Sequence, residues 1–129
     1  MIGSKPLIAV VDDEPSIRKA LTRLLRSAGM EVESFPSGVE FLEAWPAFRP
    51  DCVVLDLHMP VVDGFEVQQR LAGSPVGVPV VVITGHDSAE TQARAMASKP
   101  VAYLRKPMND EALLEAIALG LAVSRPGRP

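Results

Sequence analysis

Short, continuous runs of apolar residues, each followed by a polar residue, constrain the fold of this chain more than any other feature. Such runs occupy residues 7–11, 52–55 and 78–83. They suit strands that are buried on both faces, which is typical of parallel sheets. The weaker alternation of residues 31–35 and the short segment 101–104 predict two further strands, the first of them nearer an edge.

Amphipathic helical patterns fill the segments between these strands. Apolar residues recur at helical spacing within residues 17–28, 39–45, 65–71, 89–97 and 113–121. Pro15 fits a first helical turn, Gly29 fits a helix C-terminus, and Asn109 or Asp110 fits a cap. Strands that alternate with helices, without hairpin turns, predict an α/β fold: an open, doubly wound parallel sheet of five strands with helices on both faces.

Length and composition fit one soluble domain. The chain has 129 residues, a net charge of -3 and a single cysteine, Cys52, which excludes an internal disulfide framework and a multi-cysteine zinc site. It has no Lys/Arg-rich run, so direct binding to nucleic acid is not expected. Because it shows no signal peptide and no membrane-length apolar run, we expect a cytoplasmic protein. We expect a flexible segment 1–6, a domain at 7–122, and a tail or truncated linker at 123–129.

Five polar residues stand where the predicted strands end. Asp12 and Asp13 follow the first strand, Asp56 the third, Thr84 the fourth and Lys106 the fifth. The carboxyl ends of parallel strands meet at one edge of the sheet, and ligands of such folds bind there. Each residue alone has an ordinary structural explanation, such as a turn or a cap. Their joint arrangement predicts a shared site.

The residue types at this edge point to phosphoryl chemistry. Three clustered carboxylates repel one another, and a hard divalent cation such as Mg²⁺, which prefers oxygen ligands, relieves that repulsion. Lys106 adds a second positive charge, and Thr84 offers a hydrogen-bond donor. A cation and an ammonium together neutralise phosphoryl oxygens, and a carboxylate can be the nucleophile.

In this order and spacing, the motifs resemble the receiver domain of two-component response regulators over residues 8–121. They are Val11-Asp12-Asp13-Glu14, Asp56-Leu57-His58-Met59-Pro60 with Gly64, Ile83-Thr84-Gly85, and Tyr103-Leu104-Arg105-Lys106-Pro107. The sequence of residues 82–86 is similar to that of the nitrogen-fixation and nodulation-type regulators. In those regulators a helix-turn-helix output domain usually follows the receiver domain. The resemblance implies a CheY-like, flavodoxin-like strand order, 2-1-3-4-5.

The resemblance implies a phosphoacceptor and a metal site. Asp56 would accept a phosphoryl group from the phosphohistidine of a sensor histidine kinase or a phosphotransfer protein. Asp13, Asp56 and the backbone carbonyl of His58 would ligate Mg²⁺ directly, and Asp12 would hold it through water. Lys106 would contact a phosphoryl oxygen. Such a domain is no ordinary enzyme, because it catalyses only its own phosphoryl transfer and autodephosphorylation.

The resemblance also implies a switch. Thr84 would move towards the phosphoryl group, and Tyr103, at the aromatic switch position, would turn inward. The fourth helix, fifth strand and fifth helix would report the change to an output protein or output domain, and a homodimer would form through the same face. No membrane partner is implied. One departure bears on this face: Lys99-Pro100 stand where the family usually has Gly-Ala, and Pro100 can stop the preceding helix.

Alternative functions remain open on the sequence. A phosphatase of the haloacid dehalogenase type also uses Asp, Thr, Lys and Mg²⁺, but it needs a second Asp two positions after the nucleophile, where this chain has His58. A phosphorylation-independent interaction module would not need the intact acidic site, and a flavin-binding protein would need a phosphate-cradling loop. His58 and His86 are predicted to be exposed loop residues, although either could orient water or tune the lifetime of an aspartyl phosphate.

Overall fold

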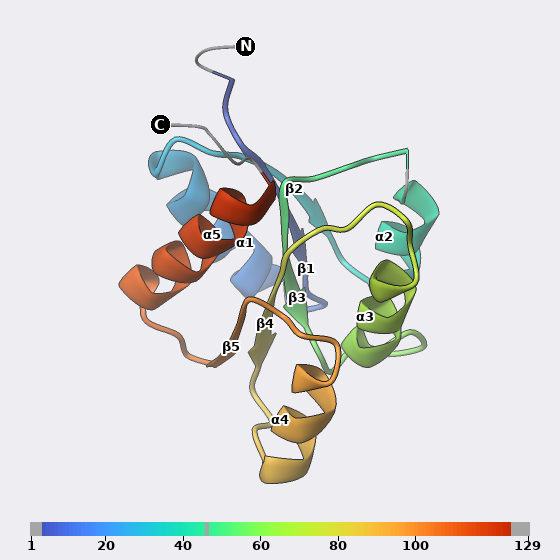
Figure 1. Ribbon diagram of the computed structural model, residues 1–129. Coiled ribbons are helices and arrows are strands. Elements are labelled where there is room, and N and C mark those ends of the chain that lie inside the picture. The colour runs from blue at the N-terminus through green and yellow to red at the C-terminus, as the bar shows by residue number, and fades with distance from the viewer. Residues whose placement is uncertain (1–3, 46, 125–129) are drawn as a thin grey trace.

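The computed structural model describes residues 4–45 and 47–124, in which five strands alternate with five helices (Figure 1). The strands are β1 (Leu7–Val11), β2 (Glu31–Phe35), β3 (Cys52–Asp56), β4 (Val80–Thr84) and β5 (Ala102–Arg105). The helices are α1 (Pro15–Ser27), α2 (Gly38–Ala44), α3 (Gly64–Ala72), α4 (Ala89–Met96) and α5 (Asp110–Ser124). Among the described residues, no helix is long and apolar enough to cross a membrane.

The strands form one parallel sheet in the order β2-β1-β3-β4-β5. The predicted fold class and strand order are therefore confirmed, including the edge position of β2. In register, Val54 of β3 lies opposite Val10 of β1 and Val81 of β4. The central strand β3 is buried along its whole length, and it ends at Asp56.

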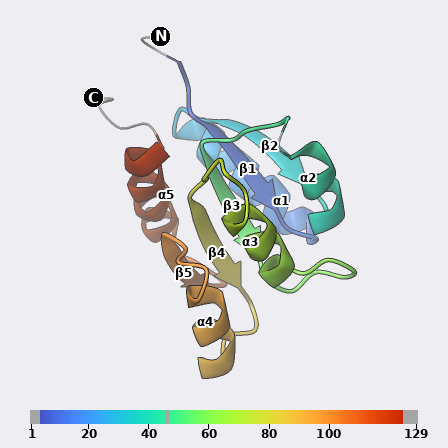
Figure 2. The same cartoon turned by 45° about the vertical axis from the view of Figure 1, so that its right-hand side comes forward.

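Alternate residues of each central strand face opposite sides of the sheet, and helices cover both sides (Figures 1 and 2). The core on the α2 and α3 side contains Ala9, Val11, Phe41, Val53, Leu55 and Val67. The core on the α1 and α5 side contains Ile8, Val10, Leu25, Cys52, Val54 and Leu113. Because both faces of these strands are buried, their sequences are continuous apolar runs rather than alternations of apolar and polar residues.

Local signals set the helix ends as the sequence indicates. Pro15 occupies the first turn of α1, and Gly29, at φ 88°, follows its last turn in the left-handed conformation. The Asn109 side chain accepts backbone N–H bonds from Glu111 and Ala112 at 2.8 and 3.2 Å, and so caps α5. These caps fix where each loop leaves the carboxyl edge of the sheet.

Some boundaries differ from the sequence-based expectation. Strand β4 begins at Val80 rather than at residue 78, and Pro79, which has no N–H to donate, directly precedes it. Helix α5 runs to Ser124, two residues past the expected domain end at 122. The expected terminal segments fall partly outside the described residues, since 1–3 and 125–129 are not described.

Helix α4 is the least embedded of the helices. It has eight residues, of which only Ala95 is buried, and it is the lowest helix in both views, at the end of the sheet where β4 and β5 finish (Figures 1 and 2). It ends at Met96, and the chain turns through Lys99 at φ 55° before Pro100. A proline disfavours helix at the preceding residue, which fits the predicted stop before β5.

Candidate functional site

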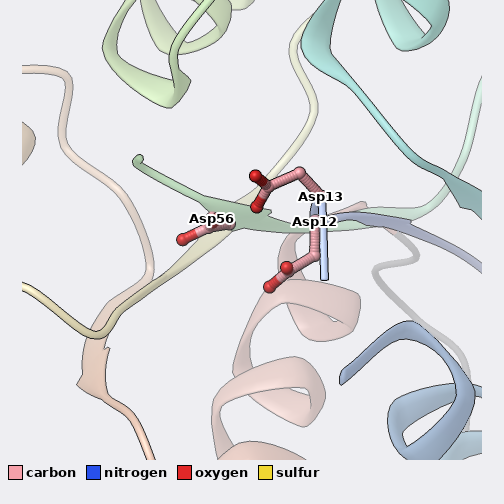
Figure 3. A group of neighbouring side chains, drawn as sticks. All are labelled: Asp12, Asp13 and Asp56. Atoms are coloured by element: carbon pink, nitrogen blue, oxygen red, sulfur yellow. The ribbon is translucent and has the colours of Figure 1, made fainter. Parts of the chain in front are cut away.

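Three carboxylates meet at the carboxyl edge of the sheet. Asp12 and Asp13 follow β1, and Asp56 ends β3 (Figure 3). One carboxylate oxygen from each of the three lies within 4.8 Å of those from the others. Asp12 is fully buried and Asp56 is 2% exposed, whereas Asp13 is more open to solvent. The structure thus brings together the three acidic residues that the sequence placed at this edge.

Gly64, the first residue of α3, allows the helix to pack against the strand end that carries Asp56. A Cβ atom added at Gly64 would collide with the carbonyl oxygen of Asp56 and lie 2.6 Å from the Cα of Leu57. The Gly64 N–H donates to the Leu57 carbonyl at 2.9 Å. A residue with a side chain would therefore displace either α3 or the backbone of the acidic site.

Lys106 is the cation of the site. Its Nζ lies 2.9 Å from Asp12 Oδ2, 2.9 Å from Glu14 Oε1 and 3.4 Å from Asp56 Oδ1. Burial alone would lower the pKa of the ammonium, but hydrogen bonds to Glu14 and Asp12 and the charge of Asp56 raise it above its usual value. Lys106 is therefore held charged against the acidic cluster. The bond from Lys106 also lowers the pKa of Glu14.

Asp56 lies in an unfavourable environment for a negative charge. Burial, followed by the charge of nearby Asp12, raises its pKa to about 7, although Lys106 opposes the shift. A cation placed among these oxygens would favour the ionised form. The donor set consists of carboxylate oxygens, which are the ligands that Mg²⁺ prefers, so the residues present fit that ion.

Thr84 ends β4 and is fully buried. Its Oγ1 accepts the backbone N–H of His86 at 3.0 Å and lies 3.2 Å from Nδ1 of His58. The two imidazole rings stand 4.8 Å apart, and burial lowers the pKa of His58. Both histidines are exposed, as predicted, but sequence reasoning missed the contact between His58 and Thr84.

Tyr103 lies on β5, next to the β4–α4 loop. Its hydroxyl donates to Asp87 Oδ1 at 2.7 Å, and Asp87 also lies 3.7 Å from a guanidinium nitrogen of Arg105. Burial and the bond to Asp87 raise the pKa of the phenol to about 12. Glu14 and Asp87 are the two site residues without a role in the sequence-based prediction.

Comparison with known proteins identifies the family. The model of the response regulator receiver domain matches residues 8–118. Given that match, the strand order and the acidic edge, this chain belongs to the response regulator receiver family. That family is a signalling domain of two-component systems rather than a classical enzyme.

Relatives from rhizobia and a solved receiver structure support the assignment. Nodulation protein W of Bradyrhizobium diazoefficiens is 37% identical over 89% of this chain and 51% of its own length. The transcriptional regulatory protein FixJ of the same species is 34% identical over 95% of this chain and 60% of its own length. A receiver protein structure from Burkholderia phymatum is 47% identical, covers 92% of this chain and 96% of that chain, and has a TM-score of 0.80.

These matches agree with the predicted likeness to nitrogen-fixation and nodulation regulators. This chain spans little more than half the length of those two regulators.

Proposed function

We propose that this chain is a phosphorylatable switch that accepts a phosphoryl group on Asp56 from the phosphohistidine of a sensor histidine kinase or a phosphotransfer protein. The placement of Asp56 supports this proposal most directly. This residue is 2% exposed, and its carboxylate lies beside those of Asp12 and Asp13 and has an oxygen 3.4 Å from Lys106 Nζ. A buried carboxylate beside a cluster of like charges is costly unless a ligand compensates for it.

The chemistry follows from the charges at this edge. A carboxylate oxygen of Asp56 attacks phosphorus, the P–N bond of the phosphohistidine breaks, and the leaving imidazole keeps the electron pair. Lys106 neutralises charge on the phosphoryl oxygens. Asp12, Asp13, Asp56 and the backbone carbonyl of His58 would hold Mg²⁺. When bound, this ion would supply further positive charge to the carboxylate and phosphoryl oxygens.

Thr84 and Tyr103 convert this charge into a conformational signal. A phosphoryl group brings about -1.5 to -2 charges and three acceptor oxygens at neutral pH. The buried Thr84 hydroxyl, which lies 3.2 Å from Nδ1 of His58, gains a charged acceptor only in the phosphorylated state, so the equilibrium between two conformations shifts. The surface of α4, β5 and α5 would present the change to an output protein or output domain, since relatives such as FixJ are transcriptional regulatory proteins. The homodimer through this face stays a prediction, for light scattering to test with and without phosphate.

The face of α1 suits an acidic phosphodonor. This helix contains four basic residues and no acidic one, and its groove is lined in part by Arg18, Lys19, Arg23 and Arg26. It begins directly after the loop that carries Asp13. A partner that delivers a phosphoryl group to Asp56 must approach this loop, and complementary charge would speed the encounter.

Intact-protein mass spectrometry tests the proposal. The protein is incubated with acetyl phosphate and Mg²⁺, alongside a chelator control, the Asp56→Ala variant and, as a matched control, Asp110→Ala on the exposed start of α5. A single adduct of about 80 Da is expected in wild type and Asp110→Ala only, and it should be lost with chelator.

An equal adduct in Asp56→Ala would contradict the proposed acceptor. If no adduct forms, transfer from a panel of phosphorylated histidine kinases decides the matter, and failure there would favour the phosphorylation-independent module. Multiple-turnover release of phosphate from small phosphate esters would instead favour a phosphatase of the haloacid dehalogenase type.

A further inference from the structure

Asp87 connects the two residues of the proposed switch. It lies in the four-residue loop between Thr84, the last residue of β4, and Ala89, the first residue of α4. From this loop its carboxylate reaches across to β5 and accepts the Tyr103 hydroxyl at 2.7 Å. The distance is typical of a strong hydrogen bond to a charged acceptor.

The same loop is attached to Thr84 at its other end. The Thr84 hydroxyl oxygen accepts the backbone N–H of His86, the residue before Asp87, at 3.0 Å. If the Thr84 hydroxyl turns towards a phosphoryl group, this bond to the loop must rearrange. The backbone that carries Asp87 then shifts, and the carboxylate no longer meets the phenol of Tyr103 in the same geometry.

We propose that Asp87 is a positioning residue that holds the partly buried Tyr103 in its observed position in the unphosphorylated chain. The inference rests on the proposed function, and it adds a specific restraint on the switch that Thr84 releases. Arg105 supports the restraint, because its guanidinium nitrogen lies 3.7 Å from the second oxygen of Asp87. Arg105 itself is largely exposed, so its contribution is the smaller one.

Loss of the restraint should shift the equilibrium towards the switched conformation. An exposed hydrogen bond of this kind corresponds to a change of about two- to fivefold in an equilibrium constant. Asp87→Ala removes the acceptor, whereas Asp87→Asn keeps a neutral oxygen in its place and should show a smaller effect. Glu90→Gln is the matched control, because Glu90 is exposed three residues along the chain and its replacement removes the same charge.

Fluorine NMR can observe the restraint directly, because Tyr103 is the only tyrosine in the chain. The 129-residue chain labelled with 3-fluorotyrosine should give a single set of signals from this ring. Without phosphate, Asp87→Ala should shift or broaden the resonance and change its solvent isotope shift between H₂O and D₂O, with Asp87→Asn intermediate. Glu90→Gln should match wild type. An unchanged spectrum in Asp87→Ala would overturn the proposal.

Phosphorylation kinetics separate this inference from the proposed function. With acetyl phosphate and Mg²⁺, Asp87→Ala should be modified about two- to fivefold faster than wild type and Glu90→Gln. A changed fluorine spectrum with equal rates would overturn the link between the restraint and the switch. If wild type accepts no phosphate from any donor, the proposed function fails, while the fluorine spectrum alone still decides whether Asp87 positions Tyr103.

Discussion

The two halves of the site are built differently. Asp12 directly follows β1, and Asp56 ends the adjacent strand β3. The residues of both strands are almost all buried, and α1 packs over them through the buried Leu21 and Leu25. On the other side, β5 is an edge strand without a fully buried residue, and α4 buries only Ala95. One half holds the acceptor in dense packing, and the other is held by few contacts.

This difference explains how a small domain can hold a nucleophile in a fixed position and still change conformation when that nucleophile is modified. The position of an acceptor carboxylate tolerates little motion, which dense packing prevents. A conformational response needs an element whose two placements differ by little free energy, and few buried apolar contacts provide that. Besides the buried Ala95, helix α4 makes polar and aromatic contacts with α3: the Gln68 amide donates to the Ala95 carbonyl at 3.0 Å, and Arg94 lies 4.0 Å from the Phe65 ring centre.

The sharpest test of the comparison truncates one apolar side chain in each half. Leu25 of α1 is fully buried, whereas Met96 of α4 is 44% exposed. Leu25→Ala should lower the free energy of unfolding by about 3 kcal/mol, and Met96→Ala by less than about 1 kcal/mol. Urea denaturation measures both. Equal losses would show that the two halves are packed alike.

The next largest effect concerns the charge of Asp56. Because its pKa rises from the ordinary 3.8 to about 7 on folding, the folded state binds the proton more tightly than the unfolded chain does. Without divalent cations, the free energy of unfolding should therefore fall as pH rises through this window. Asp56→Asn should raise it by about 1–3 kcal/mol at pH 8 and have much less effect at pH 4.

Urea denaturation across this pH range measures the effect of Asp56→Asn. Glu43→Gln, on an exposed position of α2, is the control and should show no such window. A stabilisation by Asp56→Asn that does not change with pH would contradict the assigned cause.

Cation binding should stabilise the acidic half. At ten times its dissociation constant, Mg²⁺ should raise the free energy of unfolding by about 1.4 kcal/mol through mass action. Thermal melting with Mg²⁺ and with a chelator measures this gain, and Asp13→Asn should reduce it. Stabilisation that survives in Asp13→Asn would place the ion elsewhere.

The smallest effects come from backbone strain, which each half carries at one residue. Val61, in the loop after Asp56, has φ 68°, and Lys99, after α4, has φ 55°. L-residues pay a steric cost in this left-handed region, and β-branched ones pay the most. Val61→Gly should stabilise by about 1 kcal/mol and Lys99→Gly by about 0.5 kcal/mol. Denaturant midpoints with unchanged m-values would show this, and a loss of stability in both variants would contradict it.

The sequence predicts the acidic half better than the responsive half, for a physical reason. Asp56 and Thr84 end apolar strands and Asp12 directly follows one. Parallel strand ends converge at one edge, so pattern and topology place these residues together. Glu14 and Asp87 are exposed loop residues, and no periodicity marks a loop carboxylate whose partner comes from another element. Pro100 predicts the end of α4, but it does not specify the positive φ at Lys99.

The strand order has a consequence for how the site forms and how it can be lost. Lys106 bonds to Glu14 across 92 residues of sequence, and Asp56 lies between them on the central strand. No contiguous stretch shorter than this contains the whole site, so it is complete only when β1, β3, β4 and β5 have all paired. A proteolytic cut within any intervening loop would place residues of the same charge cluster on two different fragments of the chain. Acquisition of the site during refolding should therefore coincide with global folding rather than precede it.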